Sequence, residues 1–182
     1  MLRRFRILRF LGSGAEGRVY LAKDRSLGGA PISLKVLDRP PVRALPRLRL
    51  HLSAVARIDH PNIARILDFE VAGDRRALWI AREYVPGRDL RSFGARDTTP
   101  PGELYPRLLE SVARALLHYH DRGLAHGDVR PANILCSDTP EGPMVKLIDG
   151  GVSLLPQETS PSQILHLRRQ DLRFAGSAFY TA

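Results

Sequence analysis

The chain has 182 residues, 43% of them apolar and 26% charged, a composition typical of a soluble globular protein. No apolar run approaches the roughly 18 to 20 residues of a membrane-spanning helix. Arg9 interrupts the N-terminal stretch that a secretion signal would need, so we expect a cytoplasmic protein without a membrane segment. The formal net charge is +9, but the arginines are dispersed, and we expect no nucleic-acid partner. Cys136 is the only cysteine, which excludes an internal disulfide and predicts a buried thiol in a strand.

The pattern of apolar residues predicts that the first part of the chain consists mostly of strands. Phe5 to Leu11 has a strand pattern, the glycine-rich segment Gly12 to Gly17 interrupts it, and Val19 to Ala22 resumes it, which predicts a hairpin. A third strand carries Lys35 within an otherwise apolar run. A helical stripe and two more strand patterns follow. The third strand is predicted at Ile32 to Leu37 and the helix at Ala44 to Ile58. The two later strands are predicted at Ala64 to Val71 and Ala77 to Tyr84.

A second unit is predicted after the turn at Pro86 and Gly87, which divides the chain into residues 1–85 and 86–182. Leu104 to Arg122 shows the apolar stripe of a helix. Three short strands are predicted at Leu124 to His126, Ile134 to Cys136 and Met144 to Ile148.

Several short motifs occur in the order seen in protein kinases. The glycine spacing alone also occurs in dinucleotide-binding folds, but there a helix follows the glycine turn, whereas here a strand follows it. The motifs are Gly12-x-Gly14-x-x-Gly17-x-Val19, Lys35 in the next strand, His60-Pro61-Asn62-Ile63, Glu83-Tyr84-Val85, His126-Gly127-Asp128 with Asn133, and Asp149-Gly150. The chain therefore resembles a serine/threonine protein kinase of bacterial type. The resemblance implies a protein-kinase-like α+β fold, with a five-stranded antiparallel N-terminal lobe that carries one helix, and part of a helical C-terminal lobe.

The resemblance implies that the chain binds ATP and Mg²⁺. Lys35 would pair with the α- and β-phosphates, and Asp128 would orient the substrate hydroxyl and accept its proton. Asn133 and Asp149 would hold magnesium through oxygen atoms, and Arg130 stands where related kinases have a lysine near the γ-phosphate. From the residues alone, a surface position for Lys35 and turn-forming roles for Asp128, Asn133 and Asp149 stay open.

The resemblance also assigns the nucleotide pocket. Backbone N–H groups of the glycine loop would approach the phosphates, apolar side chains would sandwich the adenine, and backbone groups at the end of the first unit would bond its edge. The residues are Gly12, Gly14 and Gly17 for the phosphates, Val19, Ser33 and Leu135 for the ring, and Glu83 and Val85 for its edge. Ser177, in the segment 176–182 that resembles the substrate-binding end of an activation segment, would face the catalytic loop.

Further positions depart from the family pattern. No Asp or Glu occurs between Arg39 and Ile58, and His51 falls where kinases place the glutamate that pairs with the strand lysine, so Glu16 or Asp149 would have to substitute. Gly150 replaces a phenylalanine and is expected to leave its segment more mobile. Gly127 replaces an arginine that receives an activating phosphate in relatives. Arg82 falls in the back wall of the adenine pocket, where we expect it to reach a carboxylate or solvent.

These features give three functional hypotheses. The leading one is an ATP- and magnesium-dependent serine/threonine kinase domain that acts on a protein substrate and is present as a fragment. The second is a pseudokinase, a nucleotide-binding regulatory module that engages a partner without transferring phosphate. The third is a phosphotransferase for small molecules, because such enzymes often share the His-Gly-Asp sequence of the catalytic loop.

The end of the sequence carries an expectation of its own. Ala182 stands at the first position of an expected Ala-Pro-Glu, so the chain is expected to stop within the second lobe. The apolar stripe of the helix 104–122, with Leu108, Leu109, Val112 and Leu116, would then lack cover, and the isolated chain would self-associate.

Overall fold

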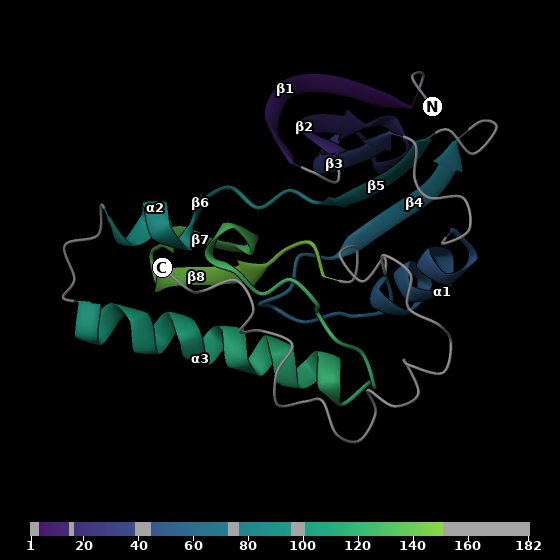
Figure 1. Cartoon of the computed structure of the whole chain (residues 1–182). Coiled ribbons are helices and arrows are strands. Elements are labelled where there is room, and N and C mark those ends of the chain that lie inside the picture. The colour runs from purple at the N-terminus through teal and green to yellow at the C-terminus, as the bar shows by residue number, and fades with distance from the viewer. Residues whose placement is uncertain (1–3, 15–16, 39–44, 73–76, 96–100, 151–182) are drawn as a thin grey trace.

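The computed structural model describes residues 4–14, 17–38, 45–72, 77–95 and 101–150. Within these ranges the strands form two sheets, one of five strands in the order β1-β2-β3-β5-β4 and one of three strands in the order β6-β7-β8 (Figure 1). All strand pairs in both sheets are antiparallel. The predicted α+β class and five-stranded sheet are confirmed. The predictions for Glu16, Ser177 and the segment 176–182 lie outside the described residues.

The five-stranded sheet is built from the strands that the apolar pattern predicts. The first three are a few residues longer than predicted, whereas the fourth begins two residues later, at Ile66, and the fifth ends one residue earlier, at Glu83. The hairpin closes at Gly14, which pairs with Gly17. Side chains alternate along β3 and β5, so Leu34 and Trp79 enter a small core on one face, whereas Leu37 and Ile80 face the main core on the other. The strands are β1 (Phe5–Gly14), β2 (Gly17–Asp24), β3 (Ala30–Asp38), β4 (Ile66–Ala72) and β5 (Ala77–Glu83).

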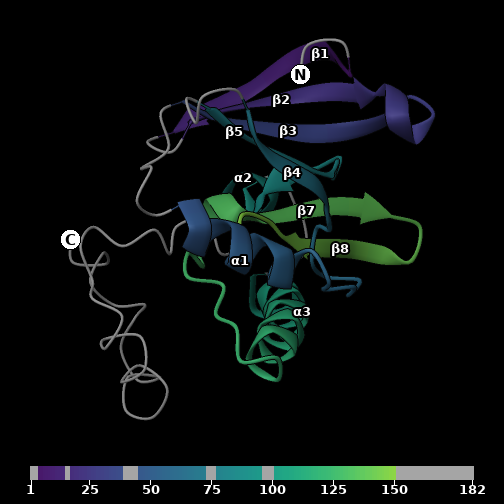
Figure 2. The same cartoon turned by 90° about the vertical axis from the view of Figure 1, so that its right-hand side faces the viewer.

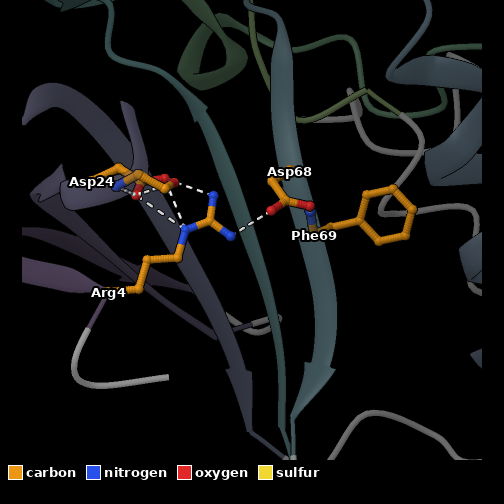
Figure 3. A network of polar contacts seen from close by, with 5 residues as sticks. Arg4, Asp24, Asp68 and Phe69 are labelled. Atoms are coloured by element: carbon orange, nitrogen blue, oxygen red, sulfur yellow. Dashed lines mark hydrogen bonds and ion pairs between the residues drawn. The ribbon is translucent and has the colours of Figure 1, made fainter. Parts of the chain in front are cut away.

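Arg4 ties the start of β1 to β2 and to β4, the strand at the opposite edge of the sheet (Figure 3). Its guanidinium donates to Asp24 at 2.7 to 3.1 Å and to Asp68 at 2.5 Å, and it lies 5.2 Å from the ring centroid of Trp79. Asp24 is fully buried and also accepts hydrogen bonds from the backbone and hydroxyl of Ser26. The hydrogen bonds from Arg4 hold the pKa of the Asp24 carboxyl below its usual value. This network fixes the edge strand at its N-terminal end.

Helix α1 (Leu45–Val55) packs beside the first sheet (Figure 2). It ends three residues before the predicted Ile58, and the predicted first residue, Ala44, lies outside the described ranges. Leu48 and Leu52, one helical turn apart, are buried in the main core. The helix is thus where the sequence predicts it.

The second part of the chain contains α2 (Leu90–Gly94), α3 (Pro101–His120), β6 (Arg88–Asp89), β7 (Ile134–Thr139) and β8 (Gly142–Leu147). None of the described helices is both long and apolar enough to cross a bilayer. The prediction of a strand at Leu124 to His126 was wrong. Gly123 and Gly127, at φ of 66° and 82°, bracket this segment, and the His126 ring rather than a backbone ladder reaches the carbonyl of Ile148. The sequence analysis did not predict the short elements β6 and α2.

The apolar stripe of α3 is covered, which contradicts the expectation that it would face water. Leu108 and Val112 are buried in the main core, because α3 runs along the three-stranded sheet in both views (Figures 1 and 2). Leu109 is 50% exposed and Leu117 is 60% exposed. Of the four predicted stripe residues, only Leu109 is largely exposed, since Leu116 is partly buried against the main core. The exposed stripe that was the reason for expecting self-association is therefore absent from the described residues.

One buried cluster joins the two sheets. It contains Leu37 and Ile80 of the first sheet, Leu52 of α1, and Leu108 and Leu147 of the second part. Cys136 of β7 is fully buried in the same cluster, as predicted, and burial raises the pKa of its thiol to about 11. The division between residues 85 and 86 stays a prediction, and this core includes residues from both sides of it.

Candidate active site

A cavity of about 920 Å³ brings every sequence-predicted site residue within the described ranges to one place. The β1–β2 hairpin, the inner face of β3 and β5, and the segment from the catalytic loop to β7 enclose it. The predicted residues on its wall are Gly12, Gly14, Gly17, Val19, Ser33, Lys35, Glu83, Val85, Asp128, Arg130, Asn133, Leu135 and Asp149. The lining residues that sequence reasoning did not place in the site, Arg9, Leu11, Ser13, Ala64, Tyr84, Gly87, Ala132 and Ile148, mostly adjoin predicted ones along the chain.

The three glycines of the hairpin differ in what they require. A Cβ at Gly17 would collide with the carbonyl oxygen of Val36, and Gly17 has a φ of 143°, so packing and backbone both demand glycine there. A Cβ at Gly12 or Gly14 would meet nothing within 4 Å. Glycine at these two positions therefore serves no packing need in the described structure, and it leaves the backbone open to a ligand in the cavity.

The end of the cavity near Glu83 is held by contacts outside it. The carboxylate of Glu83 lies 2.7 Å from Nζ of Lys146 and accepts from the backbone N–H of Arg65, while its own N–H donates to the Arg65 carbonyl. The carboxylate of Glu83 is therefore engaged outside the cavity. Val19, Ser33 and Leu135 line the cavity from three different strands, as the resemblance implies.

Lys35 and Arg82 meet at one carboxylate. Lys35 is 6% exposed and its Nζ lies 3.0 Å from Oδ2 of Asp149, while Nη1 of Arg82, a residue 4% exposed, forms an ion pair with Oδ1 of Asp149. Asp149 has a φ of 64°, a left-handed conformation that is uncommon outside glycine. Asp149, the predicted substitute that lies within the described residues, pairs with Lys35, and Arg82 reaches a carboxylate as expected.

His51 does not take the place of that glutamate. It lies on α1, partly buried, and its Nε2 has no hydrogen-bond partner among the described residues. Burial lowers the pKa of His51 below its usual value, which favours the neutral ring. A neutral imidazole cannot balance the charge of Lys35, whereas Asp149 forms an ion pair with it.

The predicted magnesium ligands do not fit a divalent cation as they lie. Mg²⁺ needs an octahedron of oxygen ligands, yet both oxygens of Asp149 face cationic side chains. Nδ2 of Asn133 is turned to Asp128, at 2.6 Å from Oδ2 and 2.9 Å from the backbone carbonyl. Among the described residues, no group of three or more His, Cys, Asp or Glu side chains could hold a metal.

The segment 126–133, which carries the predicted catalytic residues, positions Asp128 through its neighbours. Oδ2 of Asp128 accepts from Asn133 and lies 3.1 Å from Nε of Arg130. The backbone N–H of Asp128 donates to Nδ1 of His126 at 3.3 Å, and Nε2 of this buried ring lies 3.0 Å from the carbonyl oxygen of Ile148. Since the N–H can only donate, Nδ1 must be unprotonated, and Nε2 carries the proton and donates to Ile148. The loop is thus tied to the segment that carries Asp149.

Gly150 is a packing requirement. It is buried, and a Cβ there would collide with the hydroxyl of Tyr119 and approach the His126 ring to 3.0 Å. Tyr119 is 1% exposed, and burial raises the pKa of its hydroxyl to about 12. Tyr119 and His126 thus occupy the space next to Gly150 into which a side chain would extend. This close packing contrasts with the expectation that glycine leaves the segment more mobile.

We expect Gly150→Ala to lower the free energy of unfolding by about 1 to 3 kcal/mol, because an added methyl overpacks a filled site. Urea unfolding followed by circular dichroism measures this. Gly102→Ala is the matched control, since Gly102 lies in α3 with nothing within 4 Å of an added Cβ and alanine favours helices. Adding Tyr119→Phe to Gly150→Ala should recover part of the loss. Equal stability of Gly150→Ala and Gly102→Ala would contradict the close packing.

Comparisons with known proteins agree with this geometry. A profile described as protein kinase domain matches residues 5–182. The chain is 34% identical over 164 residues to the serine/threonine-protein kinase pkn2 of Myxococcus xanthus and 32% identical over 166 residues to pkn3 of the same organism. A crystal structure of the Mycobacterium tuberculosis PknI kinase domain matches with a TM-score of 0.70 and 30% identity over 90% of this chain.

The chain spans only part of these relatives. It covers 19% of pkn2, 30% of pkn3 and 65% of the PknI kinase domain chain. Because the family profile extends from Phe5 to Ala182 and the likeness includes both sequence and fold, the chain belongs to the protein kinase family.

Proposed function

We propose that this chain binds ATP in the cavity and transfers the γ-phosphate to a serine or threonine hydroxyl of a protein. The observation that carries the proposal is the convergence of Lys35, Asp128 and Asn133 on one cavity beneath the glycine hairpin. A volume of about 920 Å³ also suits a nucleotide, since ligand pockets usually measure about 300 to 1,000 Å³. The relatives are described as protein kinases, which favours a protein acceptor over a small molecule. Use of ATP supports a cytoplasmic place of action.

Within this proposal the residues have distinct tasks. Lys35 binds phosphate oxygens, and the backbone at Gly12 and Gly14 approaches them without side chains in between. Asp128 orients the acceptor hydroxyl and takes its proton, while Arg130 stabilises charge on the transferred group. ATP is accompanied by Mg²⁺ in the family, but the present contacts of Asn133 and Asp149, the ligands that the resemblance implies, do not suit a metal.

A second candidate is a nucleotide-binding module that does not transfer phosphate. It is favoured by the ion pairs of Asp149, which occupy the carboxylate that the family uses for metal. Measuring binding and transfer separately distinguishes the two functions.

The proposed function is tested by thermal unfolding with and without ATP and magnesium, together with a phosphate-transfer assay on a mixed protein substrate. At about 100 times Kd, a ligand stabilises the native state by ~2.7 kcal/mol, which raises Tm by roughly 5 to 10 °C for a chain of this size. We expect Lys35→Met to lose this shift, and Lys23→Met, outside the cavity, to keep it. A shift without transfer supports the second candidate, and absence of any shift contradicts both.

A further inference from the structure

The inner face of the five-stranded sheet carries two cations that are neighbours. Ser33 of β3 is paired with Arg82 of β5, and Lys35 is paired with Ile80, so Lys35 and Arg82 are diagonal neighbours across the two strands. Strand alternation places them on the same face as Leu37 and Ile80, the face that turns toward the second sheet. Both side chains line the cavity and both are less than 10% exposed.

The carboxylate between them is engaged at both oxygens. Oδ1 of Asp149 forms an ion pair with Arg82, and Oδ2 forms one with Lys35 at 3.0 Å. A divalent ion that used Asp149 would have to displace one or both of these contacts and stand beside two fixed positive charges. An arginine cannot lose its proton to relieve that repulsion. Arg82 therefore competes with a metal for Asp149 by its position and its permanent charge.

The same two cations suit the phosphates of a nucleotide. A polyphosphate needs positive charge and hydrogen-bond donors, which a metal ion supplies in many nucleotide sites. The guanidinium of Arg82 offers donors in a planar fork that matches phosphate oxygens, and Lys35 adds a compact charge from the adjacent strand. A polyphosphate is also a competitor for these donors, and Asp149 is the carboxylate that would share them with it.

We propose that Arg82 takes the place of the divalent cation, so that this cavity binds a nucleotide polyphosphate through Lys35 and Arg82 without requiring a metal. The inference rests on the proposed nucleotide binding and concerns its ionic requirement. It assigns Arg82 a role in binding that no family motif of the sequence supplies.

The test measures the affinity of ATP for the 182-residue chain by isothermal titration calorimetry, once with EDTA and once with excess magnesium. We expect the unchanged chain to bind in EDTA with a Kd within about threefold of its value with magnesium. Arg82→Met, an uncharged side chain of similar length, should weaken binding in EDTA about tenfold or more. Arg82→Lys is the matched control, which keeps the charge and should retain most of the metal-free affinity.

Asp149→Asn gives a second measurement that does not depend on the fold tolerating Arg82→Met. It removes the carboxylate that holds both cations, so metal-free affinity should be kept or increased. If Asp149 instead holds an essential metal, this variant should lose ATP binding. Circular dichroism of each variant without ligand checks that it is folded.

The outcomes separate this inference from the proposed function. Binding that is about tenfold or more weaker in EDTA than with magnesium in the unchanged chain overturns the inference and leaves nucleotide binding intact. Equal EDTA affinities of the unchanged chain and a folded Arg82→Met variant also overturn it, because Arg82 would then only hold Asp149 in place. Absence of ATP binding under both conditions contradicts the proposed function and the inference together.

Discussion

Replacement of Asp128 by alanine is expected to lower the rate of phosphate transfer about 10²- to 10⁴-fold, the range that a positioned general base supplies. Asp128 is held for this role, because Asn133 and Arg130 both contact Oδ2, and among the described residues no hydrogen bond falls on Oδ1. The affinity for ATP should change little, since Lys35 and the glycine hairpin are untouched. Radiolabel transfer from ATP and calorimetric ATP binding, measured on the same preparation, check the two halves of this expectation.

Two controls sharpen this measurement. Asp128→Asn keeps the shape of the side chain but removes its charge and basicity, so it should lose nearly as much transfer activity as the alanine variant. Asp138→Ala removes a carboxylate whose side chain is 72% exposed at the surface and should leave transfer unchanged. Undiminished transfer by the Asp128→Ala protein would remove Asp128 from the proposed mechanism.

Acidification is expected to destabilise the chain well above the pH at which carboxylates titrate, because His126 is buried in its neutral form. Burial lowers the pKa of His126 from 6.5 to about 4. The unfolded chain therefore binds a proton below pH 6.5 that the folded chain refuses until about pH 4. The contribution of His126 to the free energy of unfolding is fully present above pH 6.5 and is lost as pH falls toward 4. At pH 5 about 2 kcal/mol of it is lost. The proton would also occupy Nδ1, which accepts from the N–H of Asp128.

Urea unfolding at pH 7 and pH 5 measures this effect. His51 and His60 have pKa values lowered by burial as well, so the unchanged chain reports their sum with His126. The share of His126 is the difference between the chain and His126→Gln, which cannot titrate in this range. His120→Gln, at the exposed end of α3, should follow the unchanged chain. A His126→Gln variant with the same pH dependence as the unchanged chain would show that His126 does not resist protonation.

The strands and the site could be predicted because their signals are local and repeated. Alternation along β3 places Lys35 on the inner face whatever its partner, and the spacing from Asp128 to Asn133 closes a turn that brings the two side chains within 2.6 Å. Gly12, Gly14 and Gly17 predict a tight hairpin, because glycine adopts backbone conformations that other residues rarely do. All of these residues meet at one cavity, although their chemical roles stay predictions.

The other contacts of the site and the core join residues that are far apart in the sequence, and no local sequence pattern shows which of them meet. Arg82 and Asp149 are far apart in sequence. Arg82 was expected to reach a carboxylate or solvent and Asp149 was an option as partner of Lys35, but their pairing with each other was not predicted. Leu108 is buried because α3 packs on the three-stranded sheet. The first strand of this sheet, β6, has only two residues, too few to show a strand pattern in the sequence. The predicted strand at Leu124 to His126 failed because a short apolar run next to glycine does not reveal that His126 bonds through its ring.

The continuity of the main core also determines which part of the molecule can move when a ligand enters. Leu37 and Ile80 of the first sheet belong to the same cluster as Leu147 of the second, so separating the sheets would expose core to water. The glycine end of the β1–β2 hairpin has no such restraint, because β1 is an edge strand and Phe10 on it is 53% exposed. Arg4 clamps the opposite end of β1. We therefore expect the glycine end of this hairpin, rather than the junction between the two sheets, to move when the proposed nucleotide enters or leaves the cavity.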